Sequence, residues 1–525
     1  MCDNTAVSAI SPTAIPALPD GTPVSRRIVL AILLAAILVA GVPFAAYAAM
    51  VLHHFYVSGA FFYDTGQIGA LIWHSDLALR TPAVESGNSF YAIHLTPIFV
   101  LLLSAISRLL PATLQQFMAG FEGVSHALPA LGVFWLLTGP YEMRSPVGVA
   151  VAAAISVAFA FNGLALAIAR YPHFELLIVA AVILFMAALR SRQPVWAILP
   201  FVIGLATRED AGFHFCALLT IMIALDWWYG IRPTAQNAAM AFAIAGLAYS
   251  LGAVIFQHAA FSNISGLSRI YLGDPPFGRI TAGLLADRLY GYLFDRSYVV
   301  LPGLCAVVWA ILARNPYIVA GYIAFLPWVA LHFLADSDLA GSLSGYYAYP
   351  LMIASFWPLV GVLLGADRLA RPPSIRLSLL AFGGMIALSW TALPYQYNPG
   401  HLDIPESMLT PPSLAEQRAT DRAMQALIGA KATLSPLLAD GSILALAPRD
   451  FARREAVEFA GPERPRTVIY FAGGYEAARV AAIVTTAGLD YFYAVAGTPV
   501  RIASALPLPS SLGSTLPLVP AAPPR

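Results

Sequence analysis

Residues 28–52 read IVLAILLAAILVAGVPFAAYAAMVL, a run of 25 residues without a charged side chain. A helix that crosses the hydrocarbon core of a bilayer needs about 20 mainly apolar residues. The run also exceeds the apolar region of a cleaved signal peptide, which is about 7–15 residues long. The sequence therefore predicts a retained membrane anchor, with residues 1–27 as a cytoplasmic leader.

Eleven similar windows follow, and together they decide the class of protein. Of the 525 residues, 59% are hydrophobic and 11% charged, whereas soluble domains average about 45–50% apolar and 25% charged. A soluble protein is therefore excluded, and the net charge of +1 gives no basic excess for nucleic acid. The twelve charge-free windows are 28–52, 86–107, 123–141, 145–169, 176–189, 193–207, 211–225, 233–268, 297–313, 315–335, 339–366 and 377–402.

Arginine placement predicts the orientation of these spans. Short connections rich in arginine should be cytoplasmic, and they contain positions 26–27, 190–192, 232, 314 and 368–376. The loop 53–94, the turn near 170–175 and everything after residue 400 then lie outside. Three windows lie between the loop 53–94 and the turn near 170–175. Two positions on the same side of the membrane must, however, be separated by an even number of crossings. One window is therefore re-entrant or split, and 11 or 13 spans are expected.

The chain changes character near residue 400. The last 123 residues hold 22 of the 57 charges. Apolar segments at 442–446, 467–471 and 491–495 alternate with helical patterns at 414–429 and 476–489, which indicates a small α/β unit. We therefore expect an all-α polytopic protein of the cell inner membrane over 28–400, an extracytoplasmic α/β domain over 401–504 and a disordered tail over 505–525.

Two polar segments flank the first outer loop. Asp64 lies in FFYDTGQ (61–67), where the acid could meet a lipid head group or simply cap an interfacial helix. His94 lies in FYAIHLTP (90–97), where it could bind a metal or carry a proton, although a lone interfacial histidine is commonly a hydrogen-bonded structural residue.

Two more polar segments carry charges at other outer turns. His173 and Glu175 alternate in YPHFE (171–175) and could reach one site, or Glu175 could merely begin a helix. Arg208, Glu209 and Asp210 separate two apolar windows. Moving a charged side chain to the bilayer centre costs up to about 2.5–3.5 kcal/mol, so these three residues should form ion pairs or line a water-filled cavity. A solvated turn is the alternative.

The fifth segment is SGYYAYP (344–350), with Tyr346 and Tyr347 at its centre. Tyrosines are common at membrane interfaces, so a simple anchor would explain them in isolation. All five segments nevertheless fall on the same face under a topology derived from arginines alone. That coincidence predicts a single outer cavity.

These segments, in this order, resemble a family of polytopic membrane proteins known as domain of unknown function 2079, which is grouped with the GT-C membrane glycosyltransferases. The resemblance covers about residues 45–400 and departs from the family at Arg208, where relatives usually have lysine. The matching motifs are YDTGQI (63–68) through Trp73, HLTP (94–97), LPATLQ (110–115), RED (208–210) and YYAYP (346–350).

The resemblance implies a transferase that uses a polyprenyl-phosphate-linked sugar and an unknown glycan, lipid or protein acceptor. In GT-C enzymes the first outer loop carries a catalytic or metal-site acid, which Asp64 matches, and Glu175 is the candidate second acid. Arg208 would hold the donor phosphate. The other candidate substrate-binding residues are His94, Glu209, Asp210, Tyr346 and Tyr347, and the candidate ligands of a divalent cation such as Mg or Mn are Asp64, His173 and Glu175.

Two other classes of function compete with this one. A transporter or lipid flippase also needs polar residues within a helix bundle, but such proteins favour internal repeats, and none is evident here. A non-catalytic scaffold that displays the C-terminal unit is the third hypothesis.

The topology gives a direct prediction. Reporter fusions after residues 60, 290, 340 and 420 should report an outside location, and fusions near 192, 232, 314 and 371 an inside location, because arginine-rich connections stay in the cytoplasm. A cytoplasmic signal at residue 420 would overturn the whole arrangement.

Overall fold

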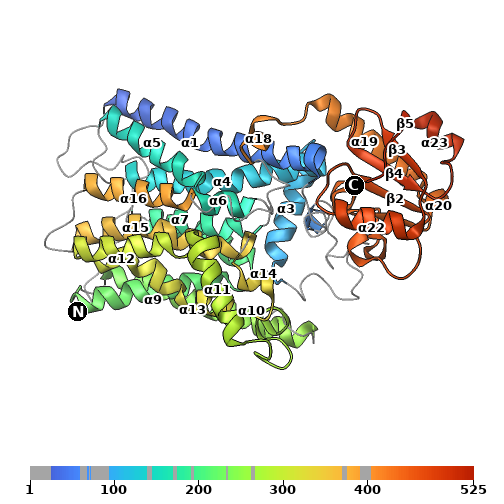
Figure 1. The fold of residues 1–525 in the computed structure, drawn as a ribbon. Coiled ribbons are helices and arrows are strands. Elements are labelled where there is room, and N and C mark those ends of the chain that lie inside the picture. The colour runs from blue at the N-terminus through green and yellow to red at the C-terminus, as the bar shows by residue number, and fades with distance from the viewer. Residues whose placement is uncertain are drawn as a thin grey trace, which may run out of the picture.

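The computed structural model describes most of the chain. The described residues are 25–59, 68–69, 71–72, 94–138, 145–169, 174–190, 194–231, 234–261, 267–343, 345–368, 375–390 and 404–524. They form a bundle of long helices that is joined at one end to a unit containing the only sheet of the described chain (Figure 1).

Each of the twelve apolar windows contains a helix. Six described helical segments are long and apolar enough to cross a membrane, or seven if a pair bent by 87° counts as one span. The chain is thus a multi-pass membrane protein. The helices are α1 (Arg26–His53), α3 (Pro97–Leu109), α4 (Leu114–Thr138), α5 (Pro146–Ala160), α6 (Gly163–Ala169), α7 (Leu176–Arg190), α8 (Pro194–Thr207), α9 (Ala211–Trp228), α10 (Thr234–Phe261), α11 (Ala282–Tyr290), α12 (Leu301–Ala313), α13 (Ala320–Phe333), α14 (Asp338–Gly341), α15 (Tyr349–Arg368) and α16 (Ile375–Trp390).

The window 86–107 differs most from a full span. Its helix, α3, begins only at Pro97, which occupies the first helical turn where a missing N–H is harmless. With 13 residues, α3 rises about 20 Å, less than the roughly 30 Å of a bilayer core. Helix length does not by itself identify the odd window expected between the two connections, because α12 also has 13 residues.

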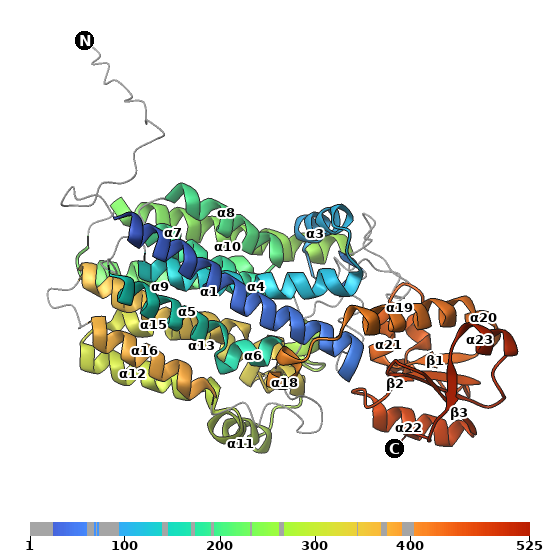
Figure 2. The same ribbon diagram turned by 90° about the horizontal axis from the view of Figure 1, so that it is seen from above.

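Helix α7 lies at the centre of the bundle. It packs against α4, α8 and α15, and the stretch Leu176–Ala188 is buried on nearly every side. Helix α1 runs along α4 and α5, while α9 packs against both α10 and α13 (Figures 1 and 2). The window 176–189 is therefore enclosed by other helices of the bundle.

The C-terminal unit contains a five-stranded sheet in the order β1-β2-β4-β3-β5. The pair β1 and β2 is parallel, and the other pairs are antiparallel. The α/β expectation is thus confirmed. The strands are β1 (Leu437–Ala439), β2 (Thr467–Phe471), β3 (Tyr491–Val495), β4 (Val500–Ser504) and β5 (Leu518–Pro520), and the helices are α18 (Ile404–Leu409), α19 (Leu414–Gly429), α20 (Lys431–Leu434), α21 (Gly441–Leu446), α22 (Ala477–Ala487) and α23 (Ser510–Thr515).

Two expectations for this unit are wrong. The apolar segment 442–446 lies in helix α21, because Asp440 caps that helix by accepting a hydrogen bond from the Ile443 N–H at 2.9 Å. The segment 505–525 is not a disordered tail over its described residues, since α23 buries Leu512 and β5 pairs with β3. Proline is tolerated there because β5 is an edge strand.

The C-terminal unit shares its main core with the bundle. Alternate residues of β2 point to opposite faces: Val468 and Tyr470 pack in a small cluster with α22, while Ile469 and Phe471 belong to a larger cluster. That larger cluster also contains Tyr47 from α1, Phe55 from the π-helical turn that follows α1, and residues of α4. The unit is therefore packed onto one end of the bundle, the end toward which α1 runs in Figure 1.

Removing the last strand should destabilise this unit. A chain ending at residue 504 loses β5 and two leucines, Leu512 and Leu516, that are 3% and 4% exposed, which removes roughly 3–6 kcal/mol of apolar burial. Limited proteolysis should then cleave within 440–495 much faster than in the full chain. A chain ending at residue 521 keeps β5 and serves as the control. Equal resistance of the two shortened chains would show that β5 contributes nothing.

Candidate functional site

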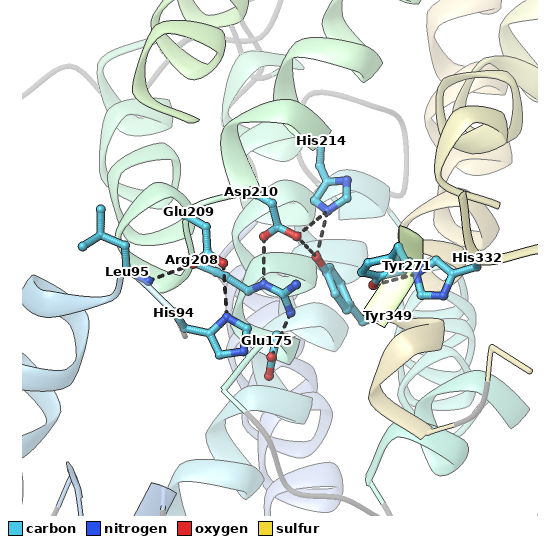
Figure 3. A network of polar contacts seen from close by, with 10 residues as sticks. All are labelled: His94, Leu95, Glu175, Arg208, Glu209, Asp210, His214, Tyr271, His332 and Tyr349. Carbon is cyan, nitrogen blue, oxygen red and sulfur yellow. Dashed lines mark hydrogen bonds and ion pairs between the residues drawn. The ribbon is translucent and has the colours of Figure 1, made fainter. Parts of the chain in front are cut away.

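The connection between α8 and α9 brings three charged residues into the bundle. The connection consists of only three residues, Arg208, Glu209 and Asp210, between Thr207 at the end of α8 and Ala211 at the start of α9. Each of the three is only 9% exposed. The alternative of a solvated turn is therefore wrong. Figure 3 shows their side chains beside those of His94, Glu175, His214 and Tyr349.

Arg208 is held by two carboxylates. Its Nη1 donates to Glu175 Oε1 at 3.0 Å, and its Nε lies 3.0 Å from Asp210 Oδ1. The remaining nitrogen, Nη2, makes no hydrogen bond or ion pair with any residue among those the structure describes. The guanidinium is thus fixed on two sides, and one donor group is left for a ligand.

Glu209 ties the same connection to the start of α3. Its Oε2 accepts a hydrogen bond from the Leu95 N–H at 2.9 Å, and its Oε1 lies 3.2 Å from His94 Nδ1. A neutral His94 fits this contact if Nδ1 carries the proton. The chain that leads into α3 is therefore anchored at the charged connection.

Asp210 leads into a second set of polar contacts. Tyr349 donates its hydroxyl proton to Asp210 Oδ2 at 3.4 Å, and His214 Nε2 lies 2.7 Å from the same hydroxyl. Since Tyr349 has one proton to give, His214 must be the donor to its oxygen. A chain of hydrogen bonds from α9 through α15 therefore ends on the carboxylate (Figure 3).

Five of these residues, His94, Arg208, Glu209, Asp210 and His214, form the polar end of a cavity of about 430 Å³. The rest of its wall is apolar and aromatic and comes mainly from α9, α10 and α13, with Phe213, Val254 and Leu331 as examples. Tyr271 and Trp328 also line the cavity, and both pack against the ring of His332 at centroid distances of 5.0 Å. The lining thus combines one group of charged and polar residues with a mainly apolar and aromatic wall.

Most of the residues proposed from the sequence meet here. His94, Glu175, Arg208, Glu209 and Asp210 form one network, and Tyr347 lines the same cavity. Asp64, His173 and the side chain of Tyr346 lie outside the described residues. Glu175 immediately precedes α7, so the expectation that it begins a helix is also correct, while its carboxylate binds Arg208.

Sequence reasoning missed several members of the site. His214 follows Asp210 by four residues on a helix, a spacing that places both on one face and could have revealed it. Tyr271 and His332 carry no local signal, because their 3.3 Å contact joins segments that are distant in sequence. Within the described chain, no group of three or more histidine, cysteine, aspartate or glutamate residues could hold a metal ion.

Comparison with known proteins gives limited information. No family model matches the chain, so the resemblance to domain of unknown function 2079 is not reproduced, and no curated protein matches either. Among solved structures, the crystal structure of ArnT from Cupriavidus metallidurans bound to undecaprenyl phosphate aligns with a TM-score of 0.45 and 12% identity, over 93% of this chain and 98% of that chain. A likeness at this level carries no argument about function.

The ion pair between Glu175 and Arg208 gives a stability prediction. Glu175→Ala leaves a buried arginine with fewer partners, and breaking a buried pair costs about 3–5 kcal/mol. We expect a clear fall in the thermal unfolding midpoint of the purified protein in detergent. Glu175→Leu combined with Arg208→Met should recover only part of the loss, because the unpaired arginine is removed but Asp210 loses its own contact with it. The exposed Glu463→Ala is the control, and an equal effect of Glu175→Ala would disprove the pair.

Proposed function

We propose that this protein is a GT-C-type membrane glycosyltransferase that moves a sugar from a polyprenyl-phosphate carrier to an acceptor on the outer face of the cytoplasmic membrane. The observation that carries the proposal is Arg208 Nη2, which has no partner among the described residues and belongs to a side chain at the polar end of an apolar cavity. A guanidinium held in place by carboxylates is well suited to bind a phosphate oxygen.

The polarity of the cavity favours an amphiphilic ligand. Walls formed by Phe213, Val254 and Leu331 would contact a hydrocarbon chain, whereas Arg208 would contact an anionic head group. Small-molecule sites generally combine apolar walls with a few placed polar groups. A lipid-linked sugar phosphate has both parts in the required order.

The charge balance of the polar end restricts how an anion can bind. One arginine stands beside three carboxylates, those of Glu175, Glu209 and Asp210. A phosphate therefore needs either proton uptake by the cluster or an accompanying cation. Mg or Mn is the cation suggested by the family resemblance, but the described residues do not complete a set of ligands, and no step is assigned to a metal.

The proposed reaction is a displacement at the anomeric carbon. The acceptor hydroxyl oxygen forms the new bond while its proton passes to a carboxylate, for which Asp64 is the candidate. The bond between the anomeric carbon and the phosphate oxygen breaks, and its electron pair stays on the lipid phosphate. Arg208 Nη2 would stabilise that developing charge.

Measurements of binding and turnover test the proposal together. Arg208→Ala should weaken binding of undecaprenyl phosphate about 10-fold to 100-fold, because a charge-assisted hydrogen bond is lost, and Arg208→Lys should be milder. Asp64→Asn should lower transfer by about 10²–10⁴-fold while binding is kept, because only the base is removed.

The control for these variants is Arg279→Ala, since Arg279 forms a surface pair in which its side chain is 56% exposed. Binding without any sugar transfer by the wild type would favour the lipid flippase or transporter. Absence of both binding and transfer would leave only the hypothesis that the protein is a non-catalytic scaffold. Wild-type turnover by purified Asp64→Asn protein would remove Asp64 from the mechanism.

A further inference from the structure

The π-helix η3 (Leu267–Leu272) is held against the connection between α13 and α14. The Asp336 N–H donates to the Tyr271 carbonyl at 2.9 Å. The Ser337 N–H donates to the neighbouring Ile270 carbonyl, also at 2.9 Å. The backbone of Tyr271, a residue of the cavity wall, is therefore fixed by a segment that is distant in sequence.

The side chain of Tyr271 is held by a buried histidine. Its hydroxyl oxygen lies 3.3 Å from His332 Nε2, and His332 Nδ1 lies 2.8 Å from the Ala340 carbonyl oxygen. A carbonyl oxygen can only accept, so Nδ1 carries the imidazole proton. His332 is 0% exposed and has no carboxylate partner among the described residues, so a second proton on its ring would be costly. Tyr271 therefore donates its hydroxyl proton to Nε2 (Figure 3).

This direction of donation determines what Tyr271 offers to a ligand. Its only hydroxyl proton is given to His332, so its oxygen can only accept a further hydrogen bond. Tyr271 lines the cavity, and it lies close enough to Arg208 and Asp210 for their charges to act on its hydroxyl. A hydrogen-bond acceptor is thus placed near the arginine that is proposed to bind phosphate.

Only one part of a lipid-linked sugar phosphate can donate to this oxygen. The hydrocarbon chain has no polar hydrogen, and the ionised phosphodiester that joins the lipid to the sugar carries no proton. A sugar has several hydroxyl groups, and each of them is a donor. The acceptor at Tyr271 therefore matches the sugar.

His332 also contacts the other aromatic residues of the cavity wall. Its ring packs against Tyr271, Trp328 and Tyr347 at centroid distances of 5.0, 5.0 and 5.6 Å, and all three of these residues line the cavity. His332 itself is not part of the lining. It can therefore affect a ligand only through the residues that it holds.

We infer that Tyr271 determines specificity by accepting a hydrogen bond from a hydroxyl group of the donor sugar, and that His332 is the positioning residue that orients Tyr271. This inference rests on the proposed function and deepens it, because it assigns a contact to the sugar. His332 touches no ligand in this scheme. It directs the Tyr271 hydroxyl and supports the aromatic wall.

Binding measurements on the full chain in detergent test the inference without any transfer reaction. The probes are undecaprenyl phosphate and a panel of hexoses and pentoses linked to undecaprenyl phosphate. The wild type should bind at least one sugar-linked probe about 10-fold tighter than undecaprenyl phosphate, and this ratio measures recognition of the sugar. Tyr271→Phe should lower the ratio about threefold to tenfold, because one hydrogen bond is lost, and should leave the affinity for undecaprenyl phosphate unchanged.

Variants of His332 test the positioning role. His332→Leu should lower the ratio by a similar factor, and adding Tyr271→Phe should change it little further, because both variants remove the same interaction. His332→Gln should restore part of the ratio, since its side-chain carbonyl can accept the Tyr271 proton. Equal weakening of both kinds of probe in His332→Leu, or full additivity in the double variant, would overturn the positioning role.

The matched control is Tyr292→Phe. Tyr292 is 4% exposed and donates its hydroxyl proton to the Gly341 carbonyl at 2.7 Å. It therefore also loses a buried hydrogen bond at α14, but it does not line the cavity. This variant should keep the ratio of the wild type, and a fall equal to that in Tyr271→Phe would overturn the assignment of Tyr271.

The same measurements separate this inference from the proposed function. Recognition of the sugar without any sugar transfer by the wild type would overturn the proposed function and support the role of Tyr271. Transfer and donor affinity that stay unchanged in Tyr271→Phe would overturn the inference and leave the proposed function intact. Equal affinity of the wild type for all probes would overturn the inference, whether or not undecaprenyl phosphate binds.

Discussion

The buried guanidinium of Arg208 is the constraint on which the rest of the site depends. A charge taken out of water is costly unless it is closely paired, and Arg208 finds its partners on two different elements, Glu175 before α7 and Asp210 before α9. Helices α7 and α9 cannot shift relative to each other without breaking that pairing. The central helix of the bundle is thereby tied to the wall of the cavity.

The same constraint explains why the site is rich in acids. Glu175 and Asp210 form ion pairs with Arg208. Glu209 accepts a hydrogen bond from the Leu95 N–H and contacts His94. Each carboxylate therefore has a local partner, yet their number exceeds that of the nearby cations. An anionic ligand adds to this excess of negative charge, so its binding requires proton uptake by the cluster or an accompanying cation.

The general architecture could be predicted from the sequence because membrane helices and alternating strands leave strong periodic signals. The meeting of four of the five polar segments was predicted from arginine positions alone, since charge in short connections reports sidedness. The fifth segment, 61–67, lies outside the described residues. The helix at 442–446 could not be predicted from the sequence, because a short apolar run fits a strand or a helix equally well. The capping hydrogen bond to Asp440 decides between the two. The contact between Tyr271 and His332 depends on tertiary packing alone.

The division of the core bears on whether the C-terminal unit is an independent display module. Such a module would bury both faces of its sheet within itself, as β2 does with Val468 and Tyr470 against α22. The opposite face of β2, with Ile469 and Phe471, is instead part of a core that includes Tyr47, Phe55 and residues of α4. Detaching the unit would expose that face to water, at roughly 25 cal/mol for each Å² of apolar surface. The unit and the bundle therefore stabilise each other, and a role confined to display does not account for a core built from both.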